Sequence, residues 1–158
     1  MKNLLSATAI ALMVTSAFST KGLADDADAR AARIMWSAFQ CYSYADRAGL
    51  KEEAEGLFIV GYEAGQQFLS AARAGLITDK EASSNVPIIV TLLLGGPSDD
   101  FMIGRVFENA ITDASDKIIK EDARGLPLAI DDWHTDPELL GTIARTKYET
   151  SNCAVILN

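Results

Sequence analysis

The sequence predicts an all-α protein, a single small domain of about five helices tied together by one disulfide. Apolar residues recur at intervals of three and four along most of the chain, which is the period of a helix buried on one side. Glycine, proline and helix-capping residues separate these stretches. The chain also has only two cysteines, Cys41 and Cys153, far apart in sequence.

The N-terminal stretch has the layout of a secretory signal peptide. Lys2 gives a positive start, residues 4–18 carry no charge, and Gly22-Leu23-Ala24 places small residues at the −3 and −1 positions. A membrane anchor is the alternative, but a spanning helix needs about 20 apolar residues. We therefore expect residues 1–24 to be removed and residues 25–158 to form one domain in the bacterial periplasm or outside the cell.

The predicted mature chain is strongly acidic. Removing Lys2 and Lys21 from the 14 basic residues leaves 12 against 22 acidic ones, a formal charge of −10. Such a surface repels phosphates, which argues against nucleic acid and against anionic membranes. It suits a basic protein partner, and it also favours simple solubility.

The two cysteines are expected to form a disulfide. Thiols that reach an oxidising compartment usually pair. Because the bridge closes a long loop, it is expected to add about 4–5 kcal/mol to the free energy of unfolding. A zinc site is excluded because it needs four clustered ligands.

Residues 27–48 are predicted to form the first helix, which Gly49 ends. Its core face is expected to contain Ala31, Ile34, Met35, Ala38, Cys41, Tyr42 and Ala45. Trp36 then points to the opposite side, and Tyr44 lies towards it. Either residues 122–158 cover this side, which we favour, or Trp36 and Tyr44 contact a partner, as exposed aromatic residues often do.

A second helix is predicted over residues 51–74. Its buried stripe is expected to contain Ala54, Leu57, Phe58, Gly61, Gly65, Phe68, Leu69 and Ala72. A glycine costs about 1 kcal/mol of helix propensity, so Gly61 and Gly65 predict a close helix crossing. Gly75 is expected to end the helix.

The middle of the chain contains one ambiguous run. Thr78 and Glu81 have the spacing of a capping box, so a short helix should start there, and Pro87 should break it. Residues 88–94, IIVTLLL, are either a buried helix or a buried strand. Residues 154–157 are the only plausible partner strand, and a two-stranded ribbon is marginal, so we favour the helix.

The next stretch, LLLGGPSDDFMIGR, is interpreted as a joint between two helices. Gly95 and Gly96 suit a left-handed helix end, and either Gly96 or Ser98 caps the helix that runs to about residue 121. The stretch lacks the Lys-Ser/Thr pair of a phosphate-binding loop. Arg105 either binds an anion or pairs with a nearby acid, Asp99 or Asp100.

The single histidine, His134, is the best candidate for catalysis or metal binding. It lies among Asp131, Asp132, Asp136 and Glu138, and a carboxylate beside histidine supports general-base chemistry, with Ser98 as a conceivable nucleophile. Pro137 stands where a calcium loop needs glycine. The simpler interpretation is an acidic loop anchored by Trp133, followed by a last helix capped by Asp136.

The early Cys41 and the Gly61-Tyr62-x-x-Gly65 stretch resemble those of periplasmic immunity proteins, which neutralise secreted cell-wall toxins. This resemblance implies a small exported helical protein that binds another protein. It assigns no functional residue.

We therefore expect a non-enzymatic, exported protein-binding domain, such as an inhibitor, an immunity protein or a stress chaperone. The candidate partner or ligand contacts are Trp36, Tyr44, Arg105 and His134. No cofactor and no metal are expected. The alternative is a small hydrolase or metal-dependent enzyme that uses His134 and neighbouring carboxylates.

Overall fold

A computed structural model describes residues 21–158, and this part of the chain is helical without a strand. The all-α prediction is therefore confirmed. A short helix at Cys153–Ile156 adds to those expected. The helices are α1 (Lys21–Arg47), α2 (Lys51–Arg73), α3 (Asp79–Asn85), α4 (Ile88–Leu93), α5 (Asp99–Ile119), α6 (Pro137–Thr150) and α7 (Cys153–Ile156), with a 3₁₀ turn at Ile130–Asp132.

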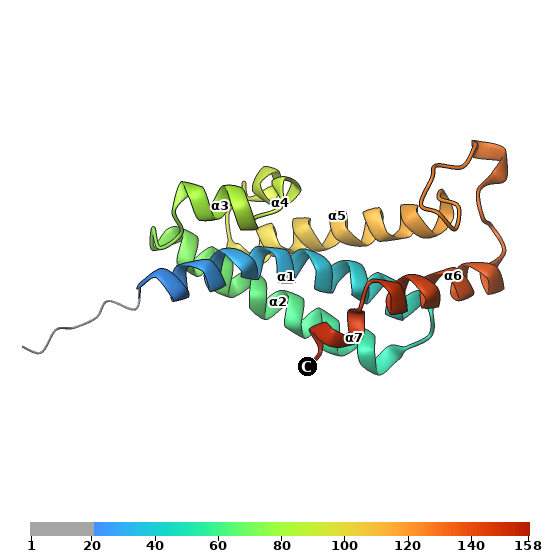
Figure 1. The fold of residues 1–158 in the computed structure, drawn as a ribbon, viewed down its shortest axis with the longest axis horizontal. Coiled ribbons are helices and arrows are strands. Elements are labelled where there is room, and N and C mark those ends of the chain that lie inside the picture. The colour runs from blue at the N-terminus through green and yellow to red at the C-terminus, as the bar shows by residue number, and fades with distance from the viewer. Residues whose placement is uncertain (1–20) are drawn as a thin grey trace, which may run out of the picture.

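The long helix α1 lies at the centre and contacts α2, α3, α5, α6 and α7 (Figure 1). One core cluster joins α1 and α2 to α4 and the first half of α5. The second cluster joins the C-terminal part of α1 to the end of α5, to α6 and to α7. Because both clusters share α1, this helix positions every surface described below.

The predicted close crossing of α1 and α2 is confirmed. A Cβ atom added at Gly61 would lie 2.5 Å from the Cε1 atom of Phe39, which is fully buried. At Gly65 the added atom would lie 2.8 Å from the Sδ atom of Met35. The two glycines therefore leave room for large core side chains of the neighbouring helix.

The predicted disulfide is present between Cys41 and Cys153. Their Cα atoms are 5.5 Å apart, which is a normal separation for a bridge. Both side chains are buried in the second core cluster. The bond fastens α7 to the C-terminal part of α1 and encloses the chain between them in one covalent loop.

The run at 88–94 is a helix, as favoured, but the expectation that it is buried is wrong in part. Val90 and Leu93 face the core, whereas Ile88 is 80% exposed and Leu92 is 70% exposed. Helix α4 has only six residues and packs on one side, so the apolar residues on its other side remain uncovered.

The joint before α5 is capped by Ser98, whose side chain accepts a hydrogen bond from the Phe101 N–H. The expectation of a left-handed glycine at 95 or 96 is wrong: among the described glycines only 49, 75 and 125 have positive φ. Position 96 requires a glycine for a different reason, because an added Cβ atom would lie 2.3 Å from the Phe101 ring. The caps expected at Thr78 and Asp136 are confirmed.

The predicted signal peptide lies mostly outside the described residues. Helix α1 begins at Lys21 and runs through the predicted cleavage position between Ala24 and Asp25. No helix in the described part of the chain is both long enough and apolar enough to cross a membrane.

Candidate functional site

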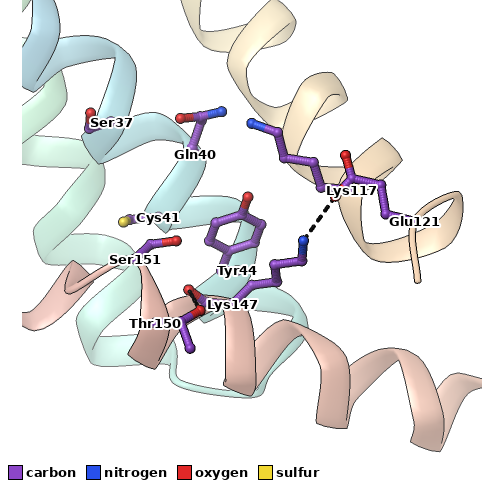
Figure 2. A pocket seen from close by; sticks show the side chains of 9 residues that line it. All are labelled: Ser37, Gln40, Cys41, Tyr44, Lys117, Glu121, Lys147, Thr150 and Ser151. Carbon is purple, nitrogen blue, oxygen red and sulfur yellow. Dashed lines mark hydrogen bonds and ion pairs between the residues drawn. The ribbon is translucent and has the colours of Figure 1, made fainter. Parts of the chain in front are cut away.

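A polar hollow opens between α5 and α6, with α1 as its floor (Figure 2). It has a volume of about 330 Å³. The residues that line it are Ser37, Gln40, Cys41 and Tyr44 from α1, Lys117 and Glu121 from the end of α5, and Lys147, Thr150 and Ser151 from α6 and its C-terminus. Cys41 places the disulfide in the wall of the hollow.

Tyr44 lies at the bottom of this polar hollow. The residue is only 3% exposed, and Figure 2 shows its hydroxyl turned towards the side chains of α5. Burial, followed by the nearby negative charges of Asp113 and Glu121, raises the pKa of Tyr44 to about 12. The phenol is therefore a neutral hydrogen-bonding group at any physiological pH.

Two ion pairs border the polar hollow. Lys147 contacts Glu121 with 2.9 Å between Nζ and Oε2, and Lys117 contacts Asp113 with 2.6 Å between Nζ and Oδ2. Asp113 also accepts a hydrogen bond from Gln40. All four charged side chains are partly exposed, so these pairs contribute little to stability and their charges remain accessible to a ligand.

His134 borders a second hollow of about 450 Å³ on the other side of the Lys147–Glu121 pair. Leu139 and Ile143 of α6 make this hollow more apolar than the first. The histidine is held in place through its backbone, since its N–H donates to the Ile119 carbonyl at 3.0 Å. Trp133, predicted to anchor the loop, is half-buried, with Lys120 Nζ 4.9 Å from its ring centroid.

The structure does not bring His134 together with the other parts of a hydrolase. Ser98 starts α5, and Arg105 lies in its second turn, whereas His134 is bonded to the last residue of that helix. At 1.5 Å per residue, Arg105 and Ile119 are about 21 Å apart along the axis. No cluster of three or more potential metal ligands occurs among the described residues.

Arg105 does not pair with Asp99 or Asp100, and that expectation is wrong. Its Nη1 donates to the carbonyl of Gly95 at 2.6 Å and to that of Leu93 at 3.2 Å. Arg105 therefore binds carbonyls at and just after the C-terminus of α4. Asp99 instead pairs with Arg73, and Asp100 accepts a hydrogen bond from the Tyr62 hydroxyl.

Trp36 is half-buried and packs on the first core cluster. It shares a shallow hollow with Ile89 of α4 and with Asn109 and Asp113 of α5. Residues 122–158 are expected beside Trp36 from the sequence, but the neighbours of Trp36 in this hollow come from α4 and α5.

A third surface, which we call the aromatic face, consists of Tyr42, Phe58, Ile59, Tyr62 and Phe107. Tyr42, Phe58 and Phe107 surround an open hollow together with Ile59 and Glu55. Their ring centroids lie 5.3–6.2 Å apart at steep angles, above the buried ring of Phe39. Phe58 is 41% exposed and Ile59 is 54% exposed, so the assignment of Phe58 to the buried stripe is wrong.

Neither the aromatic face nor most of the polar hollow is predicted from the sequence. One signal for the hollow was present, because Ser37, Gln40, Cys41 and Tyr44 follow the spacing of a single helix face. This face places polar side chains beside the cysteine. For the aromatic face no comparable signal exists, because a helix pattern cannot separate a covered aromatic ring from an exposed one.

Comparison with known proteins finds no family model, no curated protein and no solved structure that matches this chain.

Proposed function

We propose that this protein is an exported, non-enzymatic binding domain whose aromatic face binds a basic surface of another protein. The observation that carries the proposal is the exposure of Phe58 and Ile59 around a hollow rimmed by aromatic rings. Large aromatic and aliphatic side chains around a pocket are typical anchors of protein interfaces.

The charge of α2 supports a basic partner. Its only basic residues are Lys51 and Arg73 at the two ends, and acidic side chains lie between them. Glu55 lines the hollow directly, and Glu63 lies one turn beyond Ile59 on an exposed position. Lys51 is already paired with Asp46. A lysine or arginine of the partner would thus meet carboxylates at the rim and ring faces inside.

Export is the second part of the proposal. It is supported by the signal-like N-terminal sequence and by the buried Cys41–Cys153 bond, because disulfides persist in oxidising compartments. An inhibitor, an immunity protein and a stress chaperone all fit such a domain. An intact-mass measurement of protein recovered from the periplasm tests export: we expect a chain beginning at Asp25, and a mass that retains residues 1–24 would contradict it.

The test of binding compares two exposed apolar positions. Tagged wild-type protein, Ile59→Lys and the matched control Ile88→Lys are used to capture proteins from periplasmic extract, and the captured proteins are identified by mass spectrometry. We expect a basic protein that binds the wild type and Ile88→Lys, is lost from Ile59→Lys and is released by salt.

The candidate partner is then purified and its affinity measured for all three chains. Binding that survives Ile59→Lys, or a partner that is acidic, would contradict the proposal. Both substituted side chains are exposed, so circular dichroism should show all three proteins equally folded.

A further inference from the structure

The polar hollow contains hydrogen-bonding groups that the protein itself does not use. No described residue forms a hydrogen bond with the hydroxyl of Tyr44, although that residue is 97% buried and its hydroxyl faces the hollow (Figure 2). The hydroxyls of Ser37 and Ser151 line the same space and also lack partners in the described part of the chain. The hydroxyl oxygen of Tyr44 is open to the hollow, because it is not among the fully enclosed, unpartnered side-chain atoms of the described residues, so solvent or a ligand in the hollow supplies its partner.

The charges around the hollow are balanced. Lys117 and Lys147 line the hollow with two positive charges, and each is paired with a carboxylate, Asp113 or Glu121, that lies near Tyr44. A simple anion would be attracted by the two ammonium groups and repelled by the two carboxylates, and a simple cation the reverse, so neither gains much from the balanced charges. A ligand that carries one charge of each sign can form ion pairs with both.

We propose that the polar hollow binds a small zwitterion with an ammonium and a carboxylate group, such as an amino acid or a dipeptide. The ligand carboxylate lies against Lys147 and the hydroxyl of Tyr44, and the ligand ammonium lies against Glu121 or Asp113. The existing ion pairs are partly exposed, so exchanging one partner for a ligand group costs little.

The size and rigidity of the hollow fit this class of ligand. A volume of about 330 Å³ is at the small end of the range for ligand sites. The floor is α1, which the Cys41–Cys153 bond fixes beside the end of α6. Groups held in position before binding lose less entropy when the ligand arrives. The hollow is separate from the aromatic face, so this inference does not depend on the proposed function.

Titration of the ¹⁵N-labelled full chain with glycylglycine, followed by NMR, tests the proposal. We expect saturable shifts in the amide signals of residues 37–44 and 147–151, with a dissociation constant on the order of 1 mM. Acetate, methylammonium and inorganic phosphate, each with a single kind of charge, should bind at least about tenfold more weakly. Stronger binding of phosphate would contradict the proposal, as would an absence of shifts.

Two variants assign the binding to the hollow. Tyr44→Phe removes only the hydroxyl oxygen and should weaken glycylglycine binding about tenfold, the effect of one hydrogen bond to a charged group. Tyr42→Phe makes the same change on the aromatic face and should bind like the wild type. Equal affinity of Tyr44→Phe and the wild type would overturn the proposal, and amide spectra of both variants report whether the fold is intact.

Discussion

The contact between Gly61 and Phe39 sets how closely α1 and α2 approach. Gly61→Ala places a methyl group 2.5 Å from the Phe39 ring, which is fully buried, so the ring or the helices must shift. We expect the free energy of unfolding to fall by about 1–3 kcal/mol, the usual cost of overpacking. Urea denaturation followed by circular dichroism measures it.

Gly104 provides the matched control. It also lies inside a helix, but an added Cβ at Gly104 meets no atom within 4 Å. Gly104→Ala should therefore stabilise the protein by up to about 1 kcal/mol through helix propensity alone. If both alanines stabilised the protein equally, the close crossing would not be the reason for Gly61.

Trp36 is less covered than a fully buried tryptophan. Full burial predicts a loss of about 3–5 kcal/mol for Trp36→Ala. Because the ring is half-buried between α4 and α5, we expect a loss of about 2 kcal/mol. Thermal and urea unfolding measure the loss. A variant that unfolds like the parent would show that the ring adds nothing to the core and would favour a role in partner contact.

Tyr44 makes stability depend on alkaline pH. Its pKa is raised to about 12 in the folded protein, against 10.0 for an ordinary tyrosine. Below pH 10 both states keep the proton and the full stability is present. Between pH 10 and 12 the unfolded chain loses the proton first, so unfolding becomes easier as pH rises.

Other groups also titrate in this range, so Tyr44→Phe is needed for comparison. Urea denaturation at several pH values up to about 11 should show a steeper loss for the wild type than for Tyr44→Phe. Parallel curves for the two proteins would mean that burial and the charges of Asp113 and Glu121 do not affect the phenol.

At the scale of a single element, the N-cap of α5 is open to a direct test. The Ser98 side chain accepts from the Phe101 N–H at 3.2 Å, and Ser98→Ala should lower the free energy of unfolding by about 1 kcal/mol. Ser98→Asp keeps an acceptor and should retain stability. Chemical denaturation of the three proteins measures both effects, and equal losses in the two variants would argue against a capping role.

The ends of the elements could be predicted well from the sequence, because caps act locally. Thr78, Ser98 and Asp136 each accept from a backbone N–H three residues ahead, and this chemistry depends on neighbouring residues alone. Gly49 and Gly75 end their helices with positive φ for the same local reason.

What covers each helix could not be predicted in this way. Periodicity shows that a helix has an apolar side, but Ile88 of α4 and Phe58 of α2 remain exposed because no other element lies over them. The polar hollow needs side chains from α1, α5 and α6 at once. Tyr44 and Lys147 line the same hollow only because of the tertiary arrangement, and no spacing along the chain predicts this proximity.

At the scale of the whole molecule, the disulfide is expected to be the largest single contribution to stability. Replacing both Cys41 and Cys153 with alanine removes the bridge without leaving a free thiol. The loop between them spans 112 residues of sequence separation, which predicts a loss of about 4–5 kcal/mol.

Urea denaturation measures the effect of this double replacement. Wild-type protein unfolded in the presence of a reductant is the control and should lose a similar amount. A loss below about 1 kcal/mol in both experiments would contradict the loop-entropy argument for this chain.

The position of the same bond also bears on survival among proteases. The connection between α5 and α6 contains a run of exposed residues from 123 to 127, and exposed loops are where proteases cut first. Any single cut between Cys41 and Cys153 leaves two pieces that the disulfide still joins. The pieces cannot diffuse apart, and the core clusters on α1 can continue to hold them. A nicked molecule would migrate as one chain on a gel until its disulfide is reduced. A cut that would release a fragment from a helical protein without such a bond would therefore leave this protein assembled.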